Sequence, residues 1–351
     1  MKKIRVLIVD DSAFMRKILS DMLNKDYRIE VVGTARNGKD GLKKIGTLSP
    51  DVVTLDVEMP QMDGLEALER IMEECPVPVV MVSSLTKQGA ESTIKAITLG
   101  AIDFIQKPSG PISLDMEKVE DQVVRKVLIA GKAKVGNASK TPASSAPYTK
   151  VVKKPTRLNK APIIAIGTST GGPRALDTVI TNLPTNLPAP VLIVQHMPKG
   201  FTHSLAERLN RQASITVKEA SHGDILQNGH AYIAPGGQHM TVVQRDGRLV
   251  VELDETEPLY GHRPSVNRMF QSLAHLEEMQ VFSVIMTGMG ADGTEGLMEL
   301  KKNKPDTHSI AEAEESCIVF GMPKAVIKSG LADEIVPVSE ISRRLLKAIG
   351  H

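Results

Sequence analysis

The hydrophobic pattern of the chain alternates between two kinds of segment. Short aliphatic, often β-branched runs are typical of buried strands, and the stretches between them repeat apolar residues at helical spacing. In the first third of the chain the strand-like runs are Val6–Val9, Val31–Val32, Val52–Leu55, Val77–Val82 and Phe104–Ile105. The helical patterns cover Ala13–Leu23, Gly38–Leu48, Leu65–Glu74 and Ser92–Leu99. This alternation predicts an α/β domain with a five-stranded parallel, flavodoxin-like sheet that carries helices on both faces.

The same alternation returns in the second half of the chain. Three further aliphatic runs predict buried parallel strands, at Ile163–Ile166, Val191–Gln195 and Val281–Met286. Two other runs, Thr241–Val243 and Leu249–Leu253, flank Asp246-Gly247, a pair that favours the tight turn of an antiparallel hairpin. We therefore expect a second α/β domain, doubly wound and mostly parallel, with an antiparallel hairpin.

A basic, hydrophilic stretch separates the two halves. Residues 131–160 contain eight basic and no acidic residues, which accounts for the net positive charge of the chain. Such a composition, rich in Gly, Ala, Ser, Thr and Pro, predicts a flexible linker. The expected organisation is a first domain at 1–128, a linker at 129–158 and a second domain at 159–351.

Composition excludes several classes of protein. A 41% hydrophobic content supports a sizeable core, whereas 3% aromatic residues and the absence of Trp argue against a base-stacking nucleic-acid surface. The two cysteines lie in different halves, so neither a disulfide framework nor a structural zinc site is expected. Since no apolar run is long enough to span a membrane, we expect a cytoplasmic protein without membrane insertion.

Polar residues follow the predicted strands of the first domain. Asp10, Asp11, Asp56, Ser83 and Lys107 all stand where strands end, at the edge where open parallel sheets bind ligands. Converging carboxylates repel one another unless a cation lies among them, and an all-oxygen ligand set suits Mg²⁺. A metal-supported carboxylate beside a hydroxyl and a lysine is suited to accept a phosphoryl group, and the central Asp56 is the predicted acceptor.

These positions, with Met59-Pro60 and Asp63-Gly64, resemble the receiver domain of two-component response regulators. The resemblance covers about residues 1–125. It implies Mg²⁺ ligands at Asp10, Asp11, Asp56 and the backbone carbonyl of Glu58. It also implies phosphorylation of Asp56, phosphate contacts from Ser83 and Lys107, and an aromatic switch at Phe104. The receiver family more often has Thr at the position of Ser83, which retains the hydroxyl.

The second domain offers a possible nucleophile, base and orienting acid. Ser169 lies in Gly167–Pro173, a strand-to-helix turn of Gly-x-Ser-x-Gly pattern that exposes its serine. Of the nine histidines, His196 directly follows a buried strand, and Asp292 lies in the glycine-rich turn after another. Each has an ordinary structural explanation, a helix N-cap or a packed histidine, but their joint placement favours serine-hydrolase chemistry. The N–H of Met289 is a candidate oxyanion donor.

Two features limit this interpretation. The order Ser, His, Asp along the chain differs from that of the α/β-hydrolase fold. In addition, Gly288–Gly293 fits a Gly-x-Gly-x-x-Gly phosphate-binding turn, with Glu312 or Glu314 at the spacing of a ribose-binding acid. The alternative function is therefore a receiver that controls a nucleotide-binding or docking domain without esterase activity.

Taken together, the receiver, the basic linker, Gly167–Pro173, Gln195–Pro198 and Thr287–Gly293 resemble the chemotaxis response regulators that are protein-glutamate methylesterases and protein-glutamine glutaminases. The resemblance extends over essentially the whole chain. It implies Ser169 as nucleophile, His196 as general base and acid, Asp292 as orienting residue, and Thr170 and Met289 near the oxyanion. The implied substrates are glutamyl methyl esters and selected glutamines of methyl-accepting chemotaxis receptors, with a chemotaxis histidine kinase as phosphodonor. No cofactor is expected in the esterase site and no nucleic-acid partner.

Overall fold

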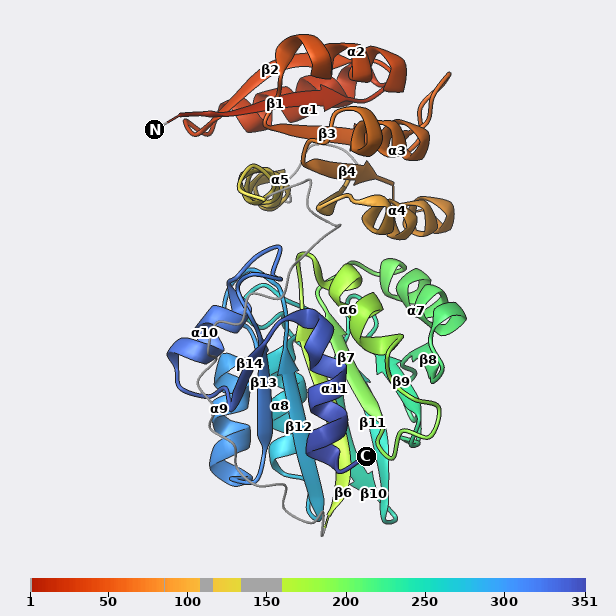
Figure 1. Cartoon of the computed structure of the whole chain (residues 1–351), viewed down its shortest axis with the longest axis vertical. Coiled ribbons are helices and arrows are strands. Elements are labelled where there is room, and N and C mark those ends of the chain that lie inside the picture. Colours follow the sequence, from red (N-terminus) through yellow and green to blue (C-terminus); the bar gives the residue numbers. More distant parts are fainter. Residues whose placement is uncertain (1, 85, 108–115, 134–159) are drawn as a thin grey trace. The chain divides into compact units, whose positions relative to one another are not determined.

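The computed structural model describes residues 2–84, 86–107, 116–133 and 160–351 (Figure 1). The chain forms two compact units, residues 1–144 and 145–351. From residue 134 onward the predicted linker lies outside the described residues. Among the helices described, none is both long and apolar enough to cross a membrane.

The first unit is built on one parallel sheet with the strand order β2-β1-β3-β4-β5. Its strands are β1 (Ile4–Val9), β2 (Ile29–Ala35), β3 (Val52–Asp56), β4 (Val79–Ser83) and β5 (Asp103–Gln106). Its helices are α1 (Ala13–Asn24), α2 (Gly38–Leu48), α3 (Gly64–Glu74), α4 (Lys87–Leu99) and α5 (Met116–Ala130). Helix α1 packs with α5, and α3 packs with both α2 and α4. The five-stranded parallel fold predicted for this unit is confirmed.

Local sequence explains where the helices of the first unit begin. Ser12, Asn37, Asp63 and Thr86 precede α1 to α4, and each side chain accepts a hydrogen bond from a main-chain N–H of the first turn. Such caps satisfy donors that a helix start otherwise leaves free. The Thr86 cap also explains why α4 begins at Lys87, five residues before the predicted start.

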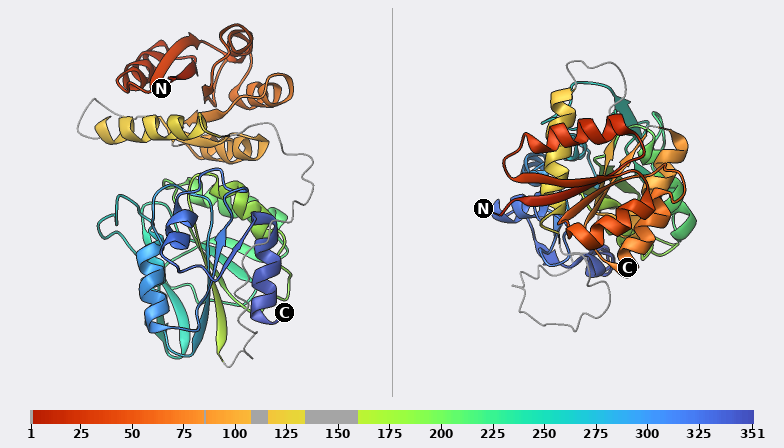
Figure 2. Two further views of the ribbon diagram at one scale, coloured as in Figure 1. Left: turned by 60° about the vertical axis from the view of Figure 1, so that its left-hand side comes forward. Right: turned by 90° about the horizontal axis from the view of Figure 1, so that it is seen from above.

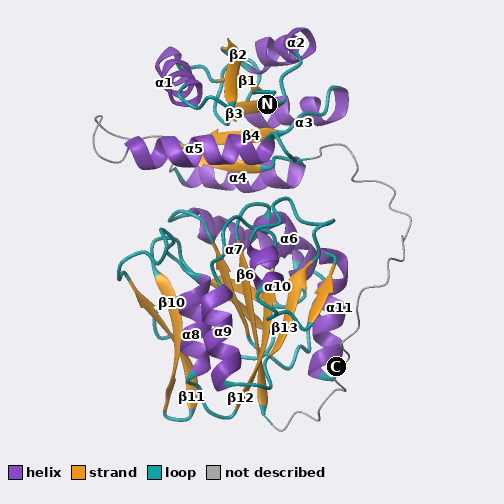
Figure 3. Cartoon of the chain, turned by 90° about the vertical axis from the view of Figure 1, so that its left-hand side faces the viewer, coloured by secondary structure: helices purple, strands orange, loops and turns teal. Residues whose placement is uncertain are grey.

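The second unit contains a seven-stranded parallel sheet with the order β14-β13-β12-β6-β7-β9-β8. The strands of this unit are drawn in orange in Figure 3. Its strands are β6 (Ala161–Thr168), β7 (Val191–Gln195), β8 (Thr216–Glu219), β9 (His230–Ile233), β12 (Met279–Ile285), β13 (His308–Glu312) and β14 (Glu334–Val336). The predicted hairpin is present as β10 (His239–Arg245) and β11 (Arg248–Asp254), which pair antiparallel as a separate sheet.

Helices cover this larger sheet (Figure 2). They are α6 (Gly172–Ile180), α7 (Phe201–Gln212), α8 (Val266–Ala274), α9 (Thr294–Asn303), α10 (Met322–Lys328) and α11 (Val338–Ile349). Helix α6 packs with α11, whereas α8 packs with α9, with β6 and with β10. Helix α8 therefore joins the hairpin to the sheet, and its Phe270 and Leu273 belong to the same core as Ile163 and Met240. The doubly wound fold with a hairpin is confirmed.

Three helices of the second unit start differently from those of the first. Gly171, Gly200 and Gly293 precede α6, α7 and α9 with φ of 79°, 88° and 95°, and no side chain caps these helices. The helices α6, α7 and α9 follow β6, β7 and β12. Because only glycine enters the left-handed region without strain, the chain reverses tightly after each of these strands. Polar residues at the three strand ends are thereby held close to the sheet edge.

Candidate functional sites

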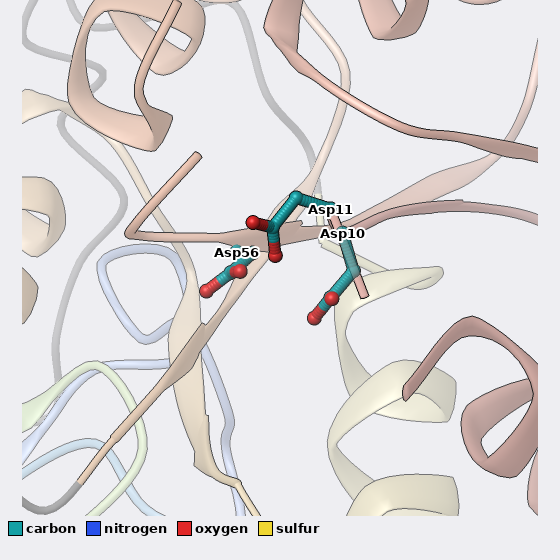
Figure 4. A group of neighbouring side chains, drawn as sticks. All are labelled: Asp10, Asp11 and Asp56. Atoms are coloured by element: carbon teal, nitrogen blue, oxygen red, sulfur yellow. The ribbon is translucent and has the colours of Figure 1, made fainter. Parts of the chain in front are cut away.

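The acidic residues of the first unit gather at the carboxyl ends of β1 and β3. Asp10, Asp11 and Asp56 each place a carboxylate oxygen within 4.8 Å of the others, and the three side chains lie around one small volume (Figure 4). Asp10 and Asp56 are buried, whereas Asp11 is exposed. The N–H of Ser12 donates to Asp10 Oδ1, and the N–H of Glu58 donates to Asp56 Oδ1. The main chain of Glu58 therefore lies at the same pocket.

Lys107 supplies the positive charge of this pocket. Its Nζ donates to Asp56 Oδ2 at 2.7 Å and lies 3.5 Å from Asp10 Oδ2, which is buried and has no hydrogen bond. Burial raises the pKa of Asp56, the hydrogen bond from Lys107 opposes that rise, and the charge of Asp10 adds to it, which leaves the pKa at about 6. One lysine thus does not fully compensate the buried acids, and the Asp10 oxygen that accepts no hydrogen bond fits an additional cation.

Ser83 and Phe104, the predicted phosphate contact and aromatic switch of the first unit, are both buried. The hydroxyl of Ser83 donates to the carbonyl oxygens of Gly89 and Ser84, at 3.1 and 3.2 Å. It is therefore engaged by the start of α4. Phe104 is 3% exposed, and Lys126 Nζ lies 4.8 Å from its ring centroid.

In the second unit the ends of β12, β6 and β7 are joined by main-chain hydrogen bonds. The N–H of Ser169 donates to Thr287 O at 3.0 Å, and the N–H of His196 donates to Thr168 O at 3.2 Å. Gln195 Nε2 also donates to Ser169 O at 2.9 Å. Because β6 lies between β12 and β7, the structure brings the segments that carry Ser169, His196 and Asp292 to one edge.

His196 and Asp292 are in direct contact at this edge. His196 Nε2 lies 2.8 Å from Asp292 Oδ2, and their side chains are 8% and 1% exposed. The other ring nitrogen, Nδ1, is buried and has no hydrogen-bond partner. The hydroxyl of Ser169 is therefore not bonded to the imidazole in this structure. Because Nε2 is bonded to the Asp292 carboxylate and Nδ1 has no hydrogen bond, Nδ1 is the ring nitrogen that can take a proton.

Asp292 is held by a set of donors from the start of α8. The Ser265 hydroxyl and the N–H groups of Val266 and Asn267 donate to its two oxygens at 2.7 to 3.0 Å. Burial by itself raises the pKa of Asp292, but the hydrogen bond and charge of His196 and these N–H donors outweigh it and lower the pKa to about 2. The carboxylate is therefore fixed in place and ionised at neutral pH.

Thr287 links the two segments that carry the candidate oxyanion donors, the N–H groups of Thr170 and Met289. Its carbonyl accepts from Ser169 N and from the Thr168 hydroxyl, and its own hydroxyl donates to Thr170 O at 2.9 Å. The next residue, Gly288, is bonded through its N–H to Val319 O and through its carbonyl to the N–H of Met322. Thr170 and Met289 thus lie in two segments whose relative position is fixed by hydrogen bonds.

The nucleotide-binding alternative is not favoured by this geometry. Asp292, inside the Gly288–Gly293 turn, has its carboxylate bonded to His196 and to the start of α8. Glu312 is 0% exposed and accepts from Thr287 N and the Ser316 hydroxyl, so it is not available to a ribose. Of the two acids at the spacing of a ribose-binding residue, Glu312 is thus a buried acceptor that holds the main chain after β12.

Sequence reasoning missed several residues of this site. Ser265 and Asn267 appear in the pattern only as the polar start of a helix, and Ser265 does cap α8. His262 was not singled out among the histidines, yet its ring stacks on that of His196, with the centroids 3.9 Å apart and the planes 6° apart. Nothing in the spacing of these residues reveals that they contact His196 and Asp292, because they come from a different part of the chain, the loop before α8 and the first turn of that helix.

The fold and these two sites define a class of protein: a response-regulator receiver combined with an α/β unit that brings a serine, a histidine and an aspartate to one edge of its sheet. Sequence comparison agrees with both parts. Residues 6–117 match the response regulator receiver domain, and residues 164–345 match the CheB methylesterase family. The chain belongs to the CheB methylesterase family.

Its relatives extend over the whole chain. A protein-glutamate methylesterase/protein-glutamine glutaminase of Geobacillus kaustophilus (strain HTA426) is 56% identical over 351 residues, covering 100% of both chains. The protein of the same name from Bacillus subtilis (strain 168) is 49% identical over 99% of this chain and 98% of its own length. The crystal structure of the Thermotoga maritima CheB methylesterase catalytic domain is 44% identical, with a TM-score of 0.51, and covers 53% of this chain and 97% of its own.

Proposed function

We propose that this chain hydrolyses glutamyl methyl esters, and the side-chain amides of selected glutamines, on the cytoplasmic helices of methyl-accepting chemotaxis receptors. The products are glutamate with methanol, or glutamate with ammonia. Family membership supports the reaction class, since the relatives named above carry both activities in their names. The observation that carries the proposal is the His196–Asp292 contact, which leaves a buried, unpartnered Nδ1 at the edge that also holds Ser169.

In this mechanism Ser169 is the nucleophile and His196 is the base. Nδ1 takes the proton of the Ser169 hydroxyl as the oxygen attacks the ester carbonyl, and it gives that proton to the departing methanol. Water then enters, loses a proton to Nδ1 and releases glutamate, and the same proton returns to Ser169. Asp292 holds Nε2–H and stabilises the positive charge that the imidazole carries between these steps. The N–H groups of Thr170 and Met289 are the proposed donors to the oxyanion.

The receiver is the proposed regulatory unit, with Asp56 as the residue that a chemotaxis histidine kinase phosphorylates. Asp10, Asp11, Asp56 and the carbonyl of Glu58 would hold Mg²⁺, a fit supported by the clustered carboxylates and by Asp10 Oδ2, which is buried and accepts no hydrogen bond. The metal supplies charge neutralisation for the incoming phosphoryl group. Lys107, which donates to Asp56 Oδ2, is the proposed contact to a phosphoryl oxygen.

Two further receiver residues are assigned by this proposal. Ser83 reaches the phosphoryl group only if its hydroxyl leaves the Gly89 carbonyl. Phe104, now buried, is the proposed aromatic switch that follows this movement. No cofactor takes part in the esterase step. The enzyme works in the cytoplasm, where its receptor substrates present their helices.

The test uses receptor-bearing membranes labelled at the methyl ester. The full-length chain should release labelled methanol, a phosphodonor with Mg²⁺ should raise the rate, and Ser169→Ala should abolish release while the chain still folds and is phosphorylated at Asp56. Asp56→Asn should keep the basal rate but lose the stimulation. Release by Ser169→Ala at the normal rate would exclude Ser169 as nucleophile. Stabilisation of residues 160–351 by a nucleotide, with no methanol release, would favour the alternative function.

A further inference from the structure

The imidazole of His196 has a second histidine against its face. The ring of His262 lies parallel to it, with an interplanar angle of 6° and a centroid distance of 3.9 Å. At this separation the two rings are in van der Waals contact face to face. His262 comes from the loop between β11 and α8, far from His196 in sequence, so only the fold brings the two rings together.

The loop that carries His262 is locally fixed. Leu259 and His262 exchange two main-chain hydrogen bonds, of 3.1 and 3.0 Å, and close a tight turn with positive φ at Tyr260 and Gly261. The hydroxyl of Tyr260 lies 2.8 and 3.0 Å from the two carboxylate oxygens of Glu295 in α9. The turn is therefore tied to the helix that follows Asp292, although Tyr260 itself is exposed.

The residues that follow His262 in the chain lead directly to the donors that hold the Asp292 carboxylate. Arg263 donates to the carbonyl oxygens of Glu255 and Thr256, which closes the loop on its other side. Ser265 and the two residues that follow it then donate to Asp292. Residues 262–267 thus contact both members of the His–Asp pair, the imidazole through its face and the carboxylate through its oxygens.

One hydrogen bond to Nε2 does not by itself fix the plane of an imidazole. The ring can still swing about its bond to Cβ, and each swing moves Nδ1, which lies on the side of the ring away from Asp292 and has no partner of its own. Contact with a flat, parallel ring removes that freedom, because any tilt costs the contact over a whole face.

We infer that His262 is a positioning residue: its ring holds the plane of His196 so that Nδ1 is directed to the hydroxyl of Ser169. The inference rests on the proposed function, in which Nδ1 is the base. His262 neither takes the serine proton nor contacts the ester. What it contributes is the aromatic face, so phenylalanine should replace it and an aliphatic side chain should not.

The experiment measures two reactions of the full-length chain. Ester hydrolysis on receptor membranes gives kcat and KM, and the rate of phosphonylation of Ser169 by a small fluorophosphonate reports the Ser–His pair without receptor docking. His262→Ala should lower kcat and the phosphonylation rate by roughly ten- to a hundredfold, the cost of a misplaced catalytic group, with KM little changed. His262→Phe should stay within about threefold of the parent.

The matched control is His230→Ala. His230 also stacks on an aromatic ring, that of Tyr232, but it lies at the amino end of β9, opposite the edge that carries the site. It should leave both rates unchanged. If His262→Ala does not fold, His262→Leu is compared with His262→Phe in its place, and the aliphatic variant should be the slower one.

Equal rates in His262→Ala and His230→Ala would overturn the inference, as would a loss in His262→Phe as large as in the aliphatic variant. The proposed function fails by a different result. If the parent chain neither hydrolyses the ester nor reacts with the fluorophosphonate, Ser169 is not an activated nucleophile. If phosphonylation depends on His262 but the ester is not hydrolysed, the positioning role is supported and the proposed substrate is wrong.

Discussion

A Cβ atom added to Gly288 would lie 2.8 Å from the Cβ of Ser169 and 2.4 Å from the sulfur of Met322. The turn after β12 thus passes directly beside the proposed nucleophile, closer than any residue with a side chain permits. Glycine at position 288 is required by this approach rather than by backbone conformation, since its φ is not in the left-handed region.

Gly288→Ala should therefore lower ester hydrolysis by about tenfold or more, because the new methyl group displaces Ser169 from its position beside the main chain of Thr287. The measurement is methanol release together with thermal unfolding. Gly46→Ala is the control: Gly46 is an exposed position in α2 where an added Cβ has nothing within 4 Å. That variant should be more stable by roughly 0.5–1 kcal/mol and fully active. Full activity of Gly288→Ala would contradict the close approach.

Ser265→Ala tests the donors around Asp292. It removes one hydrogen bond to the carboxylate and the N-cap of α8, and both losses should together reduce the free energy of unfolding by about 1–3 kcal/mol. Methanol release should fall as well, since Asp292 loses part of its fixed orientation. Ser204→Ala is the comparison, because the hydroxyl of this buried serine donates to Gly200 O, next to the start of its own helix. If the two variants lose equal activity, Ser265 has no special part in the site.

The ionised Asp292 should make stability depend on acid pH. Its pKa is lowered to about 2 in the folded chain from the usual 3.8, so its contribution is complete above pH 3.8 and is lost as the pH falls through 2. The shift corresponds to about 2 kcal/mol. In urea unfolding, the free-energy difference between the parent and Asp292→Asn should accordingly shrink as the pH is lowered from 5 towards 2. A difference that stays constant over this range would show that the carboxylate charge is not what stabilises the pair.

Mg²⁺ should stabilise the receiver against heat. A ligand that binds only the folded state raises its stability, so the unfolding temperature of residues 1–144 in the full chain should increase with Mg²⁺ concentration. Asp10→Asn should abolish this increase because it removes one of the clustered carboxylates. The control is Asp21→Asn, an exposed carboxylate that pairs with Lys17 on α1. Retention of the full Mg²⁺ effect in Asp10→Asn would place the metal elsewhere.

Much of this molecule follows from local patterns in its sequence. The five strands of the receiver were predicted because continuous aliphatic runs mark strands that are buried on both faces. The hairpin was predicted from Asp246-Gly247, a pair that favours a tight turn. In the structure both residues have positive φ, as such a turn requires. By contrast β8, β9, β13 and β14 were missed: they have only three to five residues each, and the two at the edges of the sheet, β8 and β14, have four and three, too few for a repeating pattern.

The sequence by itself determined which side chains stand at the ends of buried strands, because a parallel sheet places all those ends on one edge. Ser169, His196 and Asp292 could be named for that reason before any coordinates. Only the tertiary structure decided which ring nitrogen faces Asp292, how Ser265 and Asn267 hold it, and that His262 covers the imidazole. Those contacts are made between a loop and strands that meet only on folding, and no periodicity in the chain encodes the orientation of one side chain against another.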